Sequence, residues 1–444
     1  MSRTRFRPFV LTAASAALAF AGCQTTPEPS APAAATPRVF TADGAWCWFS
    51  DPRAVIIDGR LIAGWITTDG SVQIGSRSLA DTSAGPAATD IATLAPQFER
   101  DDHNHPALLV LPGGELAAFY ALHAAGDMHA SRTRNGQWAP PRQLQLSDPS
   151  KGRYGTTYAN PFLLSAEDNR IHLFWRGDDF KPTHATSDDL GETWSAPQTL
   201  ISERGRDSGN RPYVKYASDG RDQILLAFTD GHPRNEPRNG IHFARYRDGR
   251  FERADGSLIA PSDALPLQPA DCDHVYDGAT AGRAWIWSVA EDAAGHPVIA
   301  YTRHPTEDDH RYHYARWNGR AWEDRFITAA GRWFPHTPPG TTEREPHYSA
   351  GLALDPADPA TVYLSRPVNG IFEIERWHTA DGGATWTHQP VTQNSPADNV
   401  RPYVIPHPSS DASVVMWMHL GGGYRHYTDY NASLHFAVLE RPRG

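Results

Sequence analysis

Short apolar runs separated by turn residues recur between residues 40 and 444. Each unit of the pattern is an apolar strand, a short turn, a second strand, a polar loop, a third strand, and then a glycine turn followed by an aromatic residue. Long stretches with helical apolar spacing are scarce. This pattern is typical of many short antiparallel strands joined by tight turns. We therefore predict a single all-β domain.

The repeat length predicts a β-propeller. The aromatic residues that end five of the units lie 56, 57, 71 and 64 positions apart, and they are Trp138, Trp194, Phe251, Trp322 and Trp386. This spacing fits four-stranded blades with generous loops, so we predict a seven-bladed β-propeller, with a six-bladed ring as the alternative. Because closure removes exposed sheet edges, we expect the strand around residues 46–58 to pair with the C-terminal strand at residues 433–440.

Two of the units end in a turn that follows the pattern S-x-D-x-G-x-T-W, called an Asp-box. These turns are residues 187–194 (SDDLGETW) and 379–386 (TADGGATW). Their Asp and Gly shape the backbone and their Trp packs between strands. The element is structural, and it indicates no chemistry.

The first 22 residues have the layout of a secretory signal, with a basic start and an apolar stretch too short to span a bilayer. The sequence FAGC resembles a bacterial lipobox, so we expect lipidation of Cys23 and an outer-membrane lipoprotein; an ordinary cleaved signal without lipid is the alternative. Residues 23–38 are rich in Pro and Ala and predict a flexible linker. The propeller domain is then expected at residues 39–444.

Removal of residues 1–22 leaves 38 basic and 51 acidic residues, a net charge of −13. Such a surface is not suited to nucleic acid or anionic lipid, so an anionic substrate would need a local cluster of Arg and His. We expect no organic cofactor, contact with the membrane only through the lipid anchor, and a monomer. After Cys23 only Cys47 and Cys272 remain, too few for a disulfide framework.

Two histidines flank one predicted hairpin. His103 lies nine residues before the turn at residues 112–114, and His123 lies nine residues after it. Positions equidistant from the turn are neighbours in an antiparallel hairpin, so both imidazoles are expected at its open end.

The next hairpin repeats this arrangement with a different pair. Tyr158 lies eight residues before the turn at residues 166–169, and Arg176 lies seven after it. We expect the loops at residues 230–240 and 303–310 on the same rim, so that one propeller face collects His, Arg and Tyr. A structural interpretation is open for each residue, for instance a salt bridge of Arg176 to a neighbouring Asp or a packed rim aromatic at Tyr158.

An ordered set of motifs extends across the chain after residue 45: WCWFSDPRAV, DDHNHPAL, FYALHA, YANPF with LFWRG, DGHPRN, RYHYARWNG, HYSAGLALDP, VYLSR and NVRPYV. In this set the sequence resembles the BNR-repeat propeller proteins that include the ulvan lyases of polysaccharide lyase families 24 and 25. The resemblance implies an active site of His103, His123, Tyr158 and Arg176. The interval from Tyr158 to Arg176 is slightly longer than in the family.

The implied reaction explains these residue types. A uronate lyase removes the proton at C5, beside the carboxylate, and expels the oxygen at C4. Arg176, with help from His123, would offset the developing negative charge. His103 is the candidate base and Tyr158 the candidate acid, or the base if Arg176 lowers its pKa, and the sequence leaves the two roles open. Further candidate substrate contacts are Asn104, Arg211 and Tyr213.

The resemblance also implies a structural Zn²⁺. Cys272 and His274 in DCDH and His232 in DGHP supply a thiolate and two imidazoles, which zinc prefers, and His313 is one option for a fourth ligand. The alternative is a buried free cysteine beside an exposed histidine.

We therefore expect a polysaccharide lyase that acts on an anionic uronate-containing polysaccharide, with ulvan as the first candidate. One enzymatic alternative is an exo-acting rhamnose-glucuronate lyase or an α-L-rhamnosidase of the same propeller superfamily. Sialidase is disfavoured because SDPRAV is not the early F/Y-R-I-P motif. The non-catalytic alternative is a surface lipoprotein that binds glycans.

Overall fold

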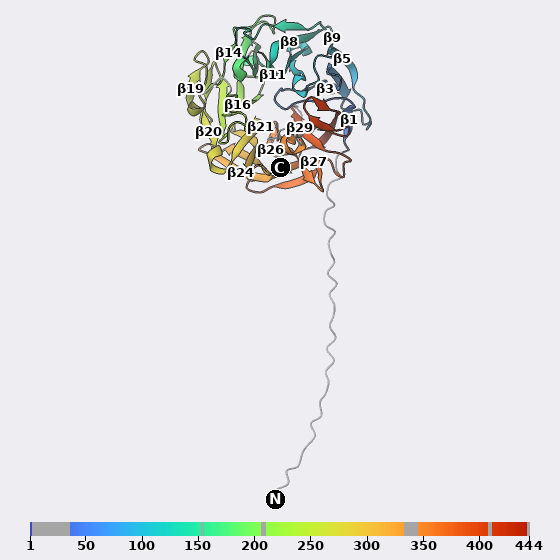
Figure 1. Cartoon of the computed structure of the whole chain (residues 1–444), viewed down its shortest axis with the longest axis vertical. Helices are drawn as coiled ribbons and strands as arrows, with labels where there is room; N and C mark the ends of the chain where they lie inside the picture. The colour runs from blue at the N-terminus through green and yellow to red at the C-terminus, as the bar shows by residue number, and fades with distance from the viewer. Residues whose placement is uncertain are drawn as a thin grey trace. The chain divides into compact units, whose positions relative to one another are not determined.

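Seven antiparallel sheets are arranged as blades around a central axis in the computed structural model (Figure 1). The first six blades begin with their innermost strand and proceed outward in chain order, and the predicted seven-bladed propeller is thereby confirmed. The structure describes Met1 and residues 36–441, apart from residues 152, 154, 206–209, 333–344 and 407–410. The predicted signal peptide, Cys23 and most of the predicted linker lie outside the described residues.

The first three blades span residues 54–199. Their strands are β2 (Ala54–Ile57), β3 (Arg60–Ile66), β4 (Val72–Ser78) and β5 (Thr89–Ala95); β6 (Ala107–Val110), β7 (Leu116–Leu122), β8 (Ala125–Arg134), β9 (Gln137–Trp138) and β10 (Arg142–Leu144); and β11 (Thr157–Leu164), β12 (Arg170–Arg176), β13 (Pro182–Ser187) and β14 (Gln198–Thr199).

The next three blades span residues 214–390. Their strands are β15 (Val214–Ser218), β16 (Gln223–Thr229), β17 (Ile241–Arg247), β18 (Arg250–Glu252), β19 (Leu258–Pro261) and β20 (Asp273–Tyr276); β21 (Arg283–Glu291), β22 (Pro297–Thr306), β23 (Asp309–Trp317) and β24 (Trp322–Gly331); and β25 (Leu352–Asp355), β26 (Asp358–Val368), β27 (Ile371–His378) and β28 (Thr387–Pro390). The blade that begins with β6 contains a fifth strand and the blade that begins with β15 contains six, whereas the other blades have the four strands expected.

The seventh blade joins the two ends of the described chain. From inside to outside it contains β29 (Asn399–Ile405), β30 (Ala412–His419), β33 (Ser433–Glu440) and β1 (Arg38–Thr41). The C-terminal strand was predicted correctly, but its partner is β1, where Val39 pairs with His435. The prediction that residues 46–58 close the ring is wrong, and the propeller begins one residue before the expected boundary.

Residues 46–53, which we call the central segment, instead lie in the centre of the ring. The Trp48 ring stacks on Trp287 of β21 with centroids 4.5 Å apart. The ammonium group of Lys215, on β15, donates to the Trp48 carbonyl and to the Asp51 carboxylate. The WCWFSDP motif is apolar because it fills the channel between the inner strands, and this buried position explains why it reads like a strand.

The Asp-box turns have the expected structural role. Asp189 accepts from the backbone N of Thr193 at 2.8 Å, and Asp381 accepts from Thr385 in the same way. The Trp194 ring meets Phe119 of the preceding blade edge to face, at 6.0 Å between centroids. Each such Trp seals the boundary between two blades, since Trp386 makes the same kind of contact with Tyr314.

The remaining regular elements are short. They are the helices α1 (Gly278–Ala281) and α2 (Glu345–Ser349), five single 3₁₀ turns, and a hairpin of β31 (Tyr424–His426) and β32 (Asp429–Tyr430) between β30 and β33. Within the described part of the chain, no helix has the length and apolar character needed to cross a bilayer.

Candidate active site

The register of the first hairpin brings His103 and His123 together, as predicted. β6 pairs with β7 so that Ala107 lies opposite Phe119. The same register, continued to the open end of the hairpin, places His103 opposite His123. The two imidazole rings stack with centroids 4.1 Å apart and planes 13° apart. His103 sits in a 3₁₀ turn over Asp102–Asn104, at the edge of the central cavity.

One carboxylate that the sequence analysis did not single out holds both rings. Asp101 Oδ1 lies 2.5 Å from Nδ1 of His103, and Asp101 Oδ2 lies 2.9 Å from Nδ1 of His123. Asp102 Oδ1 is also 3.1 Å from Nδ1 of His103. A carboxylate on one ring nitrogen fixes the tautomer and leaves the other nitrogen for chemistry. The signal available in the sequence was an Asp two residues before His103.

The histidine pair holds a single proton. Burial alone would lower the pKa of His103, but the carboxylates of Asp101 and Asp102 raise it well above its usual value. Burial and the charge on His103 lower the pKa of His123 to about 4. Burial alone would raise the pKa of the Asp101 and Asp102 carboxyls, but the cations beside them lower both pKa values, that of Asp102 to about 2. At neutral pH His103 is therefore the charged ring and His123 the neutral one, whereas a neutral His103 had been expected.

A β-bulge aims Tyr158 into the cavity. The pairing of β11 with β12 sets Thr157 against Arg176 and then shifts before Asn160, so the expected near-symmetric pairing of Tyr158 with Arg176 does not occur. Tyr158 has φ +63°, a left-handed conformation that costs a bulky residue about 1–3 kcal/mol. Its ring centroid lies 5.5 Å from that of His103. Strain of this kind is common where a bulge positions a functional side chain.

Arg176 organises the phenols beside the histidines. Its Nη1 donates to Tyr213 Oη at 3.1 Å and to Tyr158 Oη at 3.5 Å, and its guanidinium lies 4.6 Å from the centre of the Tyr158 ring. Burial and Tyr213 raise the pKa of Tyr158 well above its usual value despite the nearby Arg176. Tyr158 is thus a neutral phenol and a proton donor, and the alternative in which Arg176 makes it a base is not supported.

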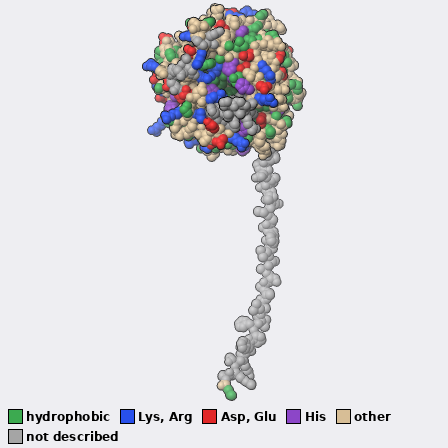
Figure 2. Space-filling model, viewed as in Figure 1, with side chains coloured by type: hydrophobic (Ala, Val, Ile, Leu, Met, Phe, Trp, Pro, Cys, Tyr) green, Lys and Arg blue, Asp and Glu red, His purple; other side chains and the backbone are tan. Residues whose placement is uncertain are grey.

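These four residues line one cavity of about 620 Å³ in the centre of a propeller face. Figure 2 shows Arg, Lys and His side chains gathered around the centre of the face in view. The cavity lining contains five arginines and a single carboxylate, which are Arg176, Arg211, Arg234, Arg401, Arg425 and Asp429. The local basic cluster that an anionic substrate would need is therefore present on this acidic protein. Aromatic residues complete the lining: Trp48, Phe49, Tyr158, Tyr213, Trp285, Tyr348 and Tyr427.

A sequence model of a protein family, described as BNR repeat-containing family member, matches residues 62–330. The chain belongs to this BNR-repeat family. The match covers more than half of the sequence and includes all four residues of the predicted active site.

Solved structures show the same fold. A polysaccharide lyase family 25 ulvan lyase bound to -[GlcA(1-4)Rha3S]- superposes on this BNR-repeat propeller with a TM-score of 0.66 at 15% identity, covering 91% of this chain and 97% of its own. The polysaccharide lyase Uly1 gives a TM-score of 0.56 at 12% identity, with the same coverage. A search of curated protein sequences finds no match. At these identities the likeness shows a shared architecture.

Asn104 supports the site from beneath instead of contacting a substrate. Its side chain is fully buried, and its Nδ2 donates to Glu99 Oε2 at 2.6 Å. The same carboxylate oxygen accepts from the backbone N of His123 at 3.2 Å. The predicted substrate contact at Asn104 is therefore wrong, because the side chain does not reach the cavity. Arg211 and Tyr213 do line it, and Arg211 Nε is buried without a hydrogen-bond partner among the described residues.

Arg401 reaches the cavity from β29 of the seventh blade and was not predicted. It lies in β29 at a shift in register, with φ +56°, so a second bulge mirrors the one at Tyr158. Its Nη1 lies 2.5 Å from Asp102 Oδ2 and donates to the Trp46 carbonyl at 2.7 Å. The pair of Arg401 and Asp102 therefore anchors both the histidine turn and the central segment. An Arg-Pro dipeptide at the start of a predicted inner strand was the available signal.

The predicted zinc ligands occupy three different surroundings. His232 lines the cavity and meets Trp285 edge to face at 4.3 Å. Cys272 is buried, and its thiol donates to the Gln268 carbonyl. His274 stacks on His242 at 5.1 Å. Of the described residues, two groups could hold a metal, and neither contains any of the predicted ligands, so this set does not fit a shared ion.

The loop at residues 303–310 contains the turn between β22 and β23, which takes the same place in its blade as the turn between β12 and β13, as predicted. Its histidines, His304 and His310, are buried and do not line the cavity. His313, the optional fourth zinc ligand, faces Asp324 at 3.1 Å.

Proposed function

We propose that this BNR-repeat propeller is a polysaccharide lyase that cleaves the bond at O4 of a uronic acid by β-elimination. The observation that carries the proposal is the convergence of four groups in one basic cavity. A stacked imidazole pair, a neutral phenol and a buried guanidinium are brought together there. These are the groups that elimination needs: a proton acceptor, a proton donor and a counter-charge for the carboxylate.

The charges of the resting site suggest how the elimination proceeds. The carboxylate of the sugar pairs with protonated His103 and with Arg176, whose Nε is buried and lacks a hydrogen-bond partner among the described residues. The neutral ring of His123 accepts the proton from C5. The electron pair of that C–H bond forms the C4–C5 double bond as the bond from C4 to O4 breaks. Tyr158 gives its phenolic proton to O4, and Arg176 stabilises the phenolate until His123 returns the proton through water.

A weakly basic His123 is compatible with this assignment. A carboxylate seated beside the pair raises the pKa of an imidazole, because opposite charges favour the protonated form. The base therefore gains strength only when the anionic substrate is bound.

The cavity is also suited to a chain of sugars. Tyr348 and Tyr427 are partly exposed in the lining, and the apolar faces of sugar rings can pack on them. Arginines on several sides can bind carboxylate or sulfate groups of neighbouring residues. The substrate that we propose is ulvan, and the lyase of similar fold bound to -[GlcA(1-4)Rha3S]- supports it.

One assay separates the proposal from its alternatives. The protein is incubated with ulvan, with desulfated ulvan and with other uronate polymers, and the ultraviolet absorbance of the unsaturated product is followed over time. A lyase produces this absorbance together with new reducing ends. A rhamnosidase produces reducing ends without absorbance, and a glycan-binding protein produces neither. Product sizes then distinguish cleavage within the chain from release of terminal units.

We further propose that the protein is exported and lipidated at Cys23, as the lipobox-like FAGC sequence suggests. Labelling with a radioactive fatty acid in the native host tests this. The wild-type chain should take up label, and Cys23→Ser should not.

A further inference from the structure

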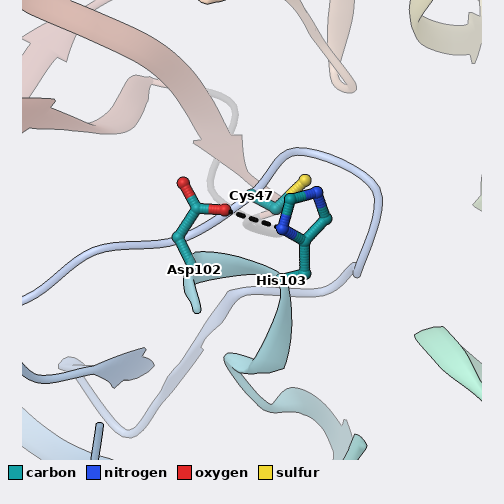
Figure 3. A group of neighbouring side chains, drawn as sticks. All are labelled: Cys47, Asp102 and His103. Carbon is teal, nitrogen blue, oxygen red and sulfur yellow. Dashed lines mark ion pairs between the residues drawn. The ribbon is translucent and has the colours of Figure 1, made fainter. Parts of the chain in front are cut away.

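The geometry points to a binding site for a thiophilic divalent cation, such as Zn²⁺, formed by Cys47, Asp102 and His103 at the floor of the cavity. The Cys47 thiol, a carboxylate oxygen of Asp102 and a ring nitrogen of His103 all lie within 4.8 Å of one another. Figure 3 shows the three side chains converging, with the carboxylate on one side of the imidazole and the sulfur on the other. This site is separate from the Cys272 region that the resemblance had implied.

The donor set matches zinc chemistry. A thiolate, an imidazole and a carboxylate are all ligands of Zn²⁺, and three protein ligands with one open position form a common arrangement. Bond lengths of about 2.0–2.3 Å set tetrahedral ligand atoms roughly 3–4 Å apart. The present separations therefore need only small side-chain movements to enclose an ion.

An independent feature of the site points to a ligand. Asp102 is fully buried, and its Oδ2 bonds to Arg401 and Tyr424. Its Oδ1 forms an ion pair with Nδ1 of His103 at 3.1 Å, in a geometry that is not that of a hydrogen bond. A buried carboxylate oxygen without a well-formed hydrogen bond is costly, and a cation would give it a direct bond.

An ion can also reach these groups. Cys47 and His103 both line the open cavity, while Cys272 does not. Binding displaces the proton of the Cys47 thiol and the proton of His103, because a metal binds thiolate and neutral imidazole. The ion would then occupy His103 and block the place of the substrate carboxylate. Zn²⁺ is thus expected to inhibit elimination, a consequence that rests on the proposed lyase activity, whereas the binding itself does not.

Titration of the metal-free full-length protein with Co²⁺ or Zn²⁺ tests the site without any assay of activity. Wild-type protein should bind one ion per chain, and Co²⁺ should give a thiolate-to-metal charge-transfer band. Cys47→Ser should lack this band, and its affinity for the ion should be at least tenfold lower. The matched control is Cys272→Ser, the other buried cysteine, which should retain both.

Three outcomes would overturn the proposal. They are the absence of binding by the wild-type protein, unchanged binding by Cys47→Ser, and loss of the band in Cys272→Ser in place of Cys47→Ser. A fourth measurement covers a poorly folded Cys47→Ser: Zn²⁺ should raise the Tm of wild type and Cys272→Ser, and an unchanged wild-type Tm contradicts the site. If the protein binds the ion but produces no unsaturated sugar, the proposed function fails and the metal site stands.

Discussion

The imidazole rings of His103 and His123 are stacked 4.1 Å apart, with one carboxylate oxygen of Asp101 directed at Nδ1 of each. Two cations at this distance repel each other, so the shared carboxylate supports one protonated and one neutral ring. Two histidines thus supply a proton acceptor and a positive charge side by side. The asymmetry comes from Asp102, which adds a second carboxylate to His103 only.

Replacing Asp101 by Asn should disable the pair while leaving both rings in place. An amide can no longer accept from both Nδ1 atoms, so the ring tautomers and the proton count change. We expect kcat to fall by about 10²- to 10⁴-fold, with a shifted pH profile that separates this positioning role from a structural one. The control is Asp188→Asn, in an Asp-box turn outside the cavity. A profile identical to wild type would contradict the role of Asp101.

Loss of the proton-transferring groups should remove turnover without unfolding the protein. His103→Ala, His123→Ala and Tyr158→Phe should each reduce kcat on ulvan by about 10²- to 10⁴-fold, since each removes an acid, a base or a counter-charge. Circular dichroism and Tm should stay close to wild type. The exposed His388→Ala is the matched control. Near wild-type rates in all three variants would show that the cavity is not the catalytic site.

The pH dependence of the rate should report His123. Its pKa of about 4 sets the acid limb of kcat/KM, so this parameter should rise as the pH increases through about 4 and the ring becomes neutral. The bound carboxylate raises the pKa of His123, and the acid limb of kcat should therefore lie at higher pH than that of kcat/KM. The alkaline limb follows loss of the protons on Tyr158 and His103. Initial rates measured across the pH range test this order of the two acid limbs. An acid limb of kcat at lower pH than that of kcat/KM would contradict the role of His123.

The bulge that carries Tyr158 should depend on Asn160. The amide of Asn160 donates to the Phe49 and Tyr158 carbonyls at 2.9 and 2.8 Å, and its Oδ1 accepts from the backbone N of Asp51 at 3.1 Å. Asn160→Ala leaves these buried groups unpaired, so the free energy of unfolding should fall by about 1–3 kcal/mol. Chemical denaturation measures this change, with the exposed Asn318→Ala as control. Lower kcat in the folded variant would connect the central segment to catalysis.

The sequence predicted the outlines of the fold because blades repeat. Strand and turn patterns predicted the seven-bladed ring, and the symmetry of the hairpin predicted the contact between His103 and His123. Both features depend on local periodicity in the sequence. The closing strand was missed because β1 is only four residues long, whereas the central segment is longer and more apolar. Apolar character reports burial, and burial in a channel cannot be told from burial in a sheet by pattern alone.

The parts of the site that were missed depend on long-range contacts. Arg401 meets Asp102 across almost 300 residues, and no local spacing signals this pairing. The bulge at Tyr158 shifts the register by one residue, which symmetric counting from the turn cannot detect. Asn104 was assigned to the substrate because it neighbours His103, but in a 3₁₀ turn adjacent side chains point in different directions, and that of Asn104 points inward.

The pairing of β1 with β33 has a bearing on how the protein matures. Residues 38–41 must wait for residues 433–440 before their sheet is complete, so the ring cannot be finished while the chain is still emerging from a ribosome. Until then β1 has no strand to pair with, and an unpaired strand invites association with other chains. Completion of the seventh blade is therefore a late event in the folding of this propeller, because it joins segments almost 400 residues apart.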